Sequence, residues 1–151
     1  MSDETDRSPR EDAPVAAFHP ARAPDRPIDN LPLERTSFVG REREVTEATR
    51  LLSERHLLTL CGPGGAGKTR LAIAVARRLV EGFEDGVWWI EFAPLSGPEL
   101  VPRAAASALG VPESQDLSPT EALVEHLKSR KTLLILDNCE HLIEACAELP
   151  C

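Results

Sequence analysis

Apolar residues recur every three or four positions in several stretches of the chain, a spacing that predicts amphipathic helices. The clearest stretch begins after Gly40, where Val45, Ala48 and Leu52 share one face and charged residues occupy the other. Two of the later helices also have a start signal. Pro98 opens one of them, and a Ser-Pro-Thr-Glu capping box at residues 118–121 opens the other. The helices predicted in this way cover residues 41–53, 69–79, 98–109, 118–130 and 140–149.

Three short runs of consecutive apolar residues alternate with these helices and predict buried strands. The runs are residues 56–61, 87–92 and 132–136, each next to a glycine or an acidic residue. Trp88 and Trp89 fall in the second run, and we expect both rings to lie in the core. The alternation of helices with buried strands favours an α/β domain with a mostly parallel sheet.

The first 34 residues differ from the rest of the chain. They hold six prolines and show no apolar periodicity, so we expect residues 1–34 to be a disordered leader and residues 35–151 to form the domain. The run 133–136 is far shorter than the roughly 18 apolar residues that cross a bilayer, and the acidic N-terminus is not a signal peptide. We therefore expect a cytoplasmic protein without a membrane partner.

Size, charge and cysteine spacing narrow the possible functions. A chain of 151 residues has room for one domain. Its net charge of −8 argues against direct nucleic-acid binding by this segment. The four cysteines contain no C-x-x-C pair, which favours reduced structural thiols over a zinc site.

One segment carries a specific chemical signal. Residues 62–69, here called the glycine-rich loop, match G-x-x-x-x-G-K-[ST] at every fixed position and lie between a predicted strand and a predicted helix. Glycines leave backbone N–H groups free to face phosphate oxygens, and the following helix directs its positive end toward them. Lys68 would reach the β- and γ-phosphates, and the Thr69 hydroxyl would take one Mg²⁺ position.

An acidic residue ends the last predicted strand. In phosphate-binding domains of this class, an aspartate at such a position holds Mg²⁺, and Asp137 is placed to do so directly or through water. A strand-end aspartate on its own more often caps a turn, but the glycine-rich loop favours the metal role. Together they predict a site for a nucleoside triphosphate and Mg²⁺.

Three segments together resemble one family of ATPases. They are TSFVGRERE at residues 36–44, TLCGPGGAGKTRLA at residues 59–72 and LILDNCEHL at residues 134–142. They are similar to the ATPase module of bacterial STAND proteins (signal-transduction ATPases with numerous domains), which include the NB-ARC-like ATPases of LuxR-type and SARP-type transcriptional regulators. The likeness covers about residues 28–149. It implies a P-loop NTPase fold, a three-layer α/β/α arrangement, and a switch between an ADP-bound resting form and an ATP-bound form that rearranges and often oligomerises.

The resemblance also implies roles for single residues. Residues 39–41 would form the loop beside the adenine, and Asp137 would be the Walker B acid. Many hydrolytic relatives place an acid directly after that aspartate, whereas Asn138 stands here and cannot accept a proton. Glu140 is the nearest acid; it could orient the attacking water or interact with a helix dipole, so slow hydrolysis is the expectation. The candidate residues are Val39, Gly40, Arg41, Gly62, Pro63, Gly64, Gly65, Ala66, Gly67, Lys68, Thr69 and Arg70 for ATP or ADP, Lys68, Asp137 and Glu140 for catalysis, and Thr69 and Asp137 for Mg²⁺.

The family's sheet has more strands than this sequence predicts. In the family, the strand between the phosphate-loop strand and the Walker B strand comes after the Walker B helix. We place only three strands, so we expect an incomplete sheet in an N-terminal fragment, with apolar side chains exposed along the gap. Regulatory domains of a longer parent, or a second copy, would be the protein partners. The alternatives are another ATP-using P-loop enzyme, such as a small-molecule kinase or an AAA-type ATPase, and an inactive remnant.

Overall fold

A computed structural model describes residues 28–33 and 40–150. All five predicted helices and two of the three predicted strands are present, with differences mainly at their ends. In chain order the elements are α1 (Glu42–Glu54), α2 (Lys68–Leu79), the 3₁₀ turn η1 (Val80–Gly82), β1 (Val87–Glu91), the 3₁₀ turn η2 (Pro98–Leu100), α3 (Val101–Ala108), α4 (Pro119–Leu127), β2 (Leu133–Asp137) and α5 (Ile143–Ala147).

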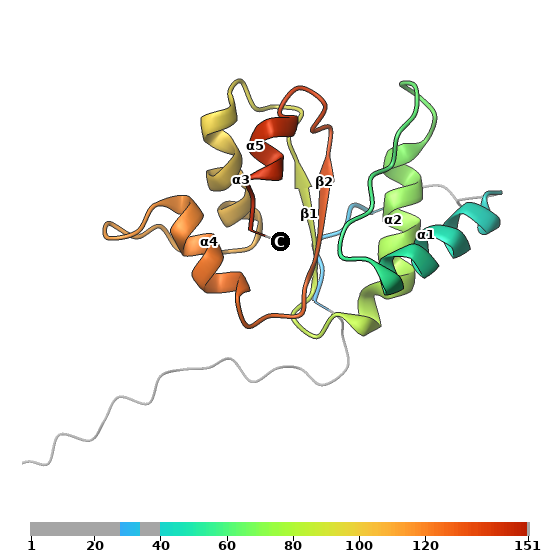
Figure 1. Ribbon diagram of the computed structural model, residues 1–151, viewed down its shortest axis with the longest axis horizontal. Coiled ribbons are helices and arrows are strands. Elements are labelled where there is room, and N and C mark those ends of the chain that lie inside the picture. The colour runs from blue at the N-terminus through green and yellow to red at the C-terminus, as the bar shows by residue number, and fades with distance from the viewer. Residues whose placement is uncertain (1–27, 34–39, 151) are drawn as a thin grey trace, which may run out of the picture.

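The two strands form a parallel sheet between two groups of helices (Figure 1). Val87 pairs with Leu133 and Glu91 with Asp137, so both strands end at the same edge of the sheet. Helices α3, α4 and α5 lie on one side, and α1 and α2 lie on the other (Figure 1). The structure thus has helices on both faces of a small parallel sheet.

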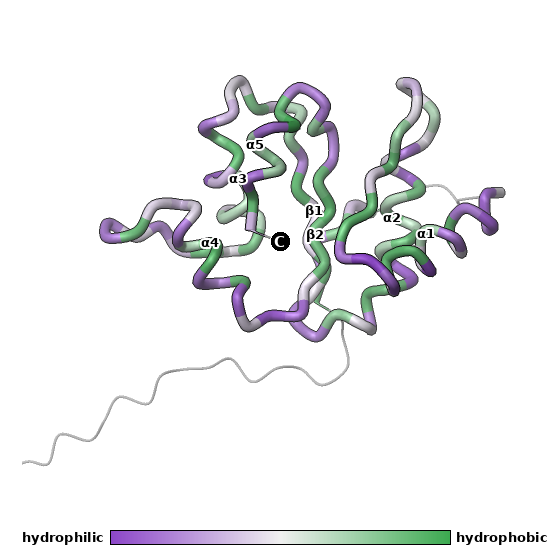
Figure 2. Tube along the Cα trace, in the orientation of Figure 1, coloured by the Kyte–Doolittle hydropathy of each residue, from purple (hydrophilic) through white to green (hydrophobic). Residues whose placement is uncertain are grey.

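Both strands are apolar at nearly every position because helices cover both faces. Val87 and Trp89 pack with Ile73 of α2, whereas Ile90 packs with Leu123 of α4 in a second cluster. Figure 2 shows the strands as a hydrophobic centre between helices with polar outer faces. Trp89 is buried in the first cluster and Trp88 packs against the second, which confirms the expectation that both rings lie in the core.

Residues 56–61 are not a strand, and that prediction was wrong. A strand is stable when its N–H and C=O groups bond to a neighbour. Within the described residues the sheet holds β1 and β2 alone, and residues 56–61 pair with neither strand. Leu58 and Leu60 pack against a cluster formed by α1 and α2, and Leu57 is 75% exposed. The expected three-stranded sheet is reduced to two strands, and every residue of β2 is only partly buried.

Residues 28–33 lie against β1, although they fall within the segment expected to be a leader. The Val87 N–H donates to the Ile28 carbonyl oxygen at 3.0 Å. The Asn30 side chain continues this pairing, since its Nδ2 donates to the Trp89 carbonyl at 3.0 Å and its Oδ1 accepts from the Trp89 N–H at 2.6 Å. A side-chain amide therefore takes the place of a neighbouring strand. The remainder of the expected leader lies outside the described residues.

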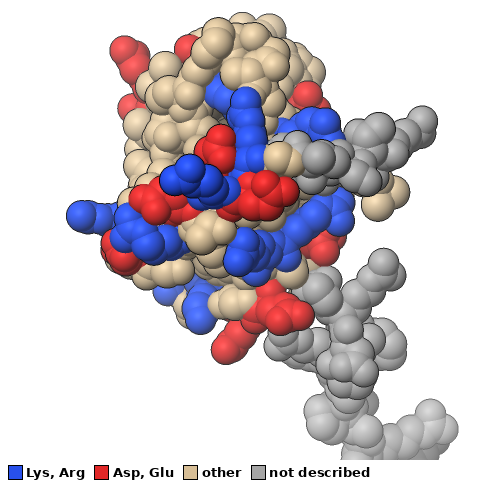
Figure 3. Space-filling view, turned by 90° about the vertical axis from the view of Figure 1, so that its right-hand side faces the viewer, with Lys and Arg blue, Asp and Glu red and all other residues tan. Residues whose placement is uncertain are grey.

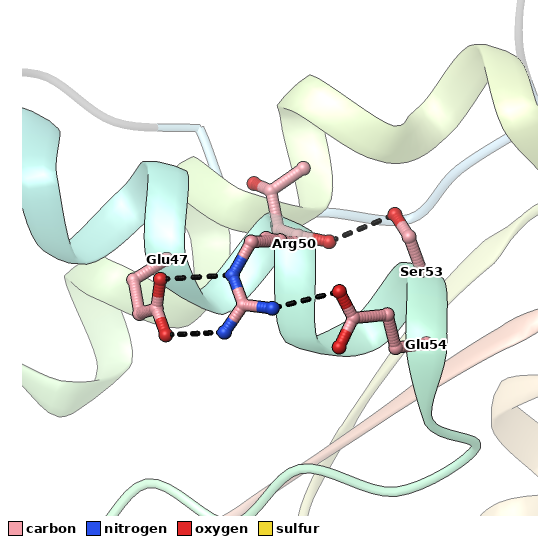
Figure 4. A network of polar contacts seen from close by, with 5 residues as sticks. Glu47, Arg50, Ser53 and Glu54 are labelled. Atoms are coloured by element: carbon pink, nitrogen blue, oxygen red, sulfur yellow. Dashed lines mark hydrogen bonds and ion pairs between the residues drawn. The ribbon is translucent and has the colours of Figure 1, made fainter.

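The face formed by α1 and α2 carries interspersed charges of both signs (Figure 3). On α1, Arg50 donates to Glu47 at 2.8 Å and to Glu54 at 2.7 Å, while the Ser53 hydroxyl donates to the Thr49 carbonyl (Figure 4). The hydrogen bond from Arg50 lowers the pKa of Glu47. Exposed ion pairs of this kind contribute little to stability, and their charged groups remain in contact with water. No helix of the described part of the chain is long and apolar enough to cross a membrane.

Candidate nucleotide-binding site

The glycine-rich loop has the backbone of a phosphate-binding turn. The Ala66 N–H donates to the Pro63 carbonyl at 3.2 Å, which closes the turn. Gly65 and Gly67 have φ angles of 76° and 77°, in the left-handed region that favours glycine. A Cβ atom added at Gly65 would meet nothing within 4 Å, so the loop lies open on this side. Its backbone is accessible to an anion.

Helix α2 begins at Lys68, so the last two residues of the glycine-rich loop form its first turn. The first N–H groups of a helix have no partner within it, and they carry the positive end of the helix dipole. Among the described residues no side chain caps α2, and its first turn holds no acidic residue. The start of the helix is therefore compatible with an external anion, as the glycine pattern predicts.

The side chain of Lys68 folds back over the loop. Its Nζ donates to the Gly62 carbonyl at 2.9 Å and to the Pro63 carbonyl at 3.3 Å, and it lies 4.0 Å from a carboxylate oxygen of Glu140. The two carbonyls are neutral, so they accept hydrogen bonds from the ammonium group without neutralising its charge. The ammonium group is thus held beside the loop and can exchange toward an anion there.

Thr69 and Asp137 meet although 68 positions separate them in the sequence. The Thr69 hydroxyl lies 3.1 Å and 3.2 Å from the two carboxylate oxygens of Asp137. The contact joins the first turn of α2 to the last residue of β2. Hydroxyl and carboxylate oxygens are the ligands that Mg²⁺ prefers, so the pair fits the metal role that the sequence predicts.

Asn138 has a role that the sequence analysis missed. Its Nδ2 donates to a carboxylate oxygen of Asp137 at 3.3 Å, and its φ is 56°. Asparagine is one of the few non-glycine residues that adopt left-handed backbone readily. An asparagine directly after a strand-end aspartate is the signal that could have indicated this orienting contact.

Glu140 lies in the turn before α5, and its side chain is 67% exposed. Helix α5 begins at Ile143, and the acidic residue of its first turn is Glu144. The prediction that a helix begins at Glu140 was wrong, and Glu140 therefore lies outside the first turn of α5. Glu140 instead faces Lys68 across the site.

The turn before α1 also reaches the glycine-rich loop. Gly40 has a φ of 82° and Arg41 a φ of 64°, which is strained for a residue with a side chain. The Nη1 atom of Arg41 lies 3.9 Å from the position that a Cβ would take at Gly67. Arg70 lies in the first turn of α2 and is exposed. Of the expected adenine loop, Val39 lies outside the described residues.

Comparison with known proteins agrees with this geometry. The model of one protein family, described as an AAA domain, matches residues 49–149, a span that includes the glycine-rich loop and Asp137. The chain belongs to the AAA domain family. Membership assigns a P-loop NTPase fold to this AAA domain, and P-loop domains of the family generally bind a nucleotide with Mg²⁺.

Relatives of this AAA domain include uncharacterised and regulatory proteins. The uncharacterized protein Rv0894 of Mycobacterium tuberculosis is 40% identical over 114 residues, which cover 76% of this chain and 29% of that protein. The putative HTH-type transcriptional regulator Rv0890c of the same organism is 42% identical over 99 residues, covering 66% and 11%. The regulatory protein AfsR of Streptomyces coelicolor is 31% identical, covering 90% and 15%. The chain thus spans less than a third of the length of these relatives, and no solved structure matches it.

Proposed function

We propose that the chain is the nucleotide-binding switch module of a STAND-type regulatory ATPase, which binds ATP and ADP with Mg²⁺. The observation that carries this proposal is the contact of Thr69 with Asp137 beside the glycine-rich loop. A loop alone would provide an anion site. A hydroxyl and a carboxylate at its end add the oxygen ligands for the cation that accompanies nucleotide phosphates.

Each group at the site has a defined task in this proposal. The loop N–H groups and the start of α2 bind the phosphates, and the Lys68 ammonium exchanges its carbonyl partners for phosphate oxygens. Thr69 and Asp137 hold Mg²⁺, which neutralises phosphate charge when bound, and Asn138 orients Asp137. The Arg41 side chain reaches the loop at Gly67, and in this proposal Gly40, Arg41 and Arg70 complete the nucleotide site.

Hydrolysis at this site is slow. The position after Asp137 holds an amide, which cannot take a proton from water. Glu140 is the nearest acid, and in this arrangement its exposed carboxylate faces Lys68. A long-lived nucleotide complex suits a switch, in which the bound nucleotide reports a state, better than it suits a motor.

The switch acts within a longer protein. A relative named as a putative transcriptional regulator and another named as a regulatory protein support a link to transcription, although the net charge of −8 argues against DNA contact by this segment itself. The output is then a change in regulatory domains of the parent or in self-association.

Thermal unfolding of the purified chain tests the proposal. A nucleotide that binds the folded state stabilises it by about 2.7 kcal/mol at a hundredfold excess over its dissociation constant. We expect Mg·ATP and Mg·ADP to raise the midpoint, and Lys68→Ala to abolish the rise. Lys128→Ala is the matched control, since it removes the same charge from an exposed ion pair outside the site and should keep the shift. A wild-type midpoint that neither nucleotide changes would contradict the proposal, and so would a full shift in Lys68→Ala.

A further inference from the structure

The Glu140 carboxylate lies near Lys68, and nucleotide binding as described above gives it no task. The Lys68 Nζ atom is 4.0 Å from a carboxylate oxygen of Glu140, so the two groups interact as charges and not through a hydrogen bond. The Lys68 side chain is 27% exposed, and the Glu140 side chain is 67% exposed. A negative charge therefore lies within reach of the ammonium group of the glycine-rich loop.

The backbone next to Glu140 is anchored independently of this ion pair. The Nε2 atom of His141 lies 3.2 Å from the Leu95 carbonyl oxygen in the loop that follows β1. The Leu142 N–H donates to the Cys139 carbonyl at 2.9 Å across the turn, and the Leu142 side chain is buried in the core. The two residues that follow Glu140 thus hold the turn in place, and the position of the carboxylate near the loop is a consequence of the fold.

A phosphate at the glycine-rich loop has to compete with this carboxylate for Lys68. The ammonium group now donates to the Gly62 and Pro63 carbonyls, and the nearby negative charge of Glu140 stabilises it in that position. The same negative charge repels a phosphate that approaches the loop. Both effects favour the nucleotide-free arrangement of Lys68 and oppose the nucleotide-bound one.

We propose that the contact between Glu140 and Lys68 is autoinhibitory and lowers the affinity of the site for nucleotide phosphates. The inference rests on the proposed function, since it concerns the regulation of the same site. The turn that carries Glu140 joins β2 to α5, so a displacement of α5 changes the distance between the two charges. Movement of the carboxylate away from Lys68 raises the affinity, which gives a longer protein a way to control nucleotide binding through α5.

Calorimetric titration of the full chain with Mg·ADP, and separately with pyrophosphate, tests the contact. Glu140→Gln keeps the size of the side chain and removes its charge. Exposed ion pairs change an equilibrium by up to about fivefold, so we expect this variant to bind both ligands about three- to fivefold more tightly than the wild type. Glu144→Gln is the matched control, because it removes the same charge from an exposed residue in the first turn of α5 and should keep the wild-type affinity.

Salt dependence is a second readout of the same contact. The Debye length falls from about 10 Å at 0.1 M salt to about 3 Å at 1 M, so high salt screens exposed charges from each other. We expect the difference in affinity between Glu140→Gln and the wild type to shrink over this range. A difference that salt does not change would contradict an effect of charge.

The direction of the change in affinity distinguishes autoinhibition from other roles of Glu140. A carboxylate that only orients the attacking water leaves the affinity for Mg·ADP unchanged when it is replaced, and one that holds water on Mg²⁺ weakens binding. Either result, or an equal gain in Glu144→Gln, would overturn the inference and leave the proposed function intact. A wild-type chain that binds neither ligand would contradict the proposed function. Binding in Glu140→Gln alone would in that case support the contact, and binding in neither protein would overturn it.

Discussion

The side chain of Asn30 pairs with β1 as a neighbouring strand would, and replacing it with alanine removes that pairing. Asn30→Ala deletes both hydrogen bonds to Trp89, one to its carbonyl at 3.0 Å and one from its N–H at 2.6 Å. Trp89 is only 9% exposed, so water has poor access to the groups that lose their partner. The substitution therefore destabilises the fold at the outer edge of the sheet.

The magnitude follows from the two bonds. Each intramolecular hydrogen bond contributes about 0.5–1.5 kcal/mol, with the higher values where a shielded partner is left unsatisfied. We expect Asn30→Ala to lower the free energy of unfolding by about 2 kcal/mol. For a domain of this size the loss corresponds to a fall in the thermal midpoint of roughly 8 °C.

Urea unfolding followed by tryptophan fluorescence is the assay. The chain has two tryptophans, Trp88 and Trp89, and both lie on β1, where the perturbation acts. A loss of about 2 kcal/mol should lower the urea midpoint by roughly 1 M without changing the slope m. An unchanged slope would show that both proteins expose the same amount of surface on unfolding.

Leu33→Ala is the matched control in the same segment. Leu33 is 91% exposed, so its truncation should change the free energy of unfolding by less than about 0.5 kcal/mol. The pairing role of Asn30 would be refuted if Asn30→Ala also stayed within about 0.5 kcal/mol of the wild type.

Three further substitutions test other parts of the fold. Leu123→Ala truncates a fully buried side chain and should lower the free energy of unfolding in urea by about 3–4 kcal/mol. Val124→Ala, at a residue 45% exposed, should lower it far less, and equal losses would contradict the packing of α4. Ser118→Ala removes the helix cap and should cost about 1 kcal/mol at pH 7. Hydrogen bonds to Ser118 lower the pKa of Glu121, so the capping box stabilises the fold above the ordinary pKa of glutamate. This stabilisation is lost as acid protonates Glu121. The difference in free energy of unfolding between Ser118→Ala and the wild type should therefore shrink in urea titrations at pH 3. Burial lowers the pKa of His126 below 6.5, so the unfolded chain takes up the proton first and stability falls as the pH drops below 6.5. His126→Gln should reduce the change in free energy of unfolding between pH 7.5 and 5. An unchanged pH dependence in this variant would contradict the role of His126.

Local signals in the sequence were sufficient to locate most elements. The Ser118 box and the proline after it specify where α4 begins, and the structure shows the complete capping box. The consecutive apolar residues of β1 and β2 report burial on both faces, which neighbouring helices supply. The fixed positions of the glycine-rich loop predicted a turn between an extended segment and a helix, and α2 begins at Lys68 as the pattern requires.

Most features that depend on distant partners were not predicted from the sequence. Residues 56–61 have the composition of a strand, but a strand needs a neighbour to pair with, and among the described residues this segment pairs with neither β1 nor β2. The pairing of Asn30 with Trp89 joins positions 59 apart and has no local signature. The contact of Thr69 with Asp137 was accessible only through the chemistry that both residues share, because Mg²⁺ binding requires their oxygens at one place.

The most direct test of nucleotide binding at the glycine-rich loop is calorimetric titration of Mg·ADP into the wild type, Lys68→Ala and Lys128→Ala. We expect one saturable site in the wild type and in Lys128→Ala, and at least tenfold weaker binding in Lys68→Ala, which corresponds to about 1.4 kcal/mol. Equal affinity in all three proteins would place the nucleotide elsewhere. Absence of heat in the wild type at millimolar Mg·ADP would contradict nucleotide binding by this chain.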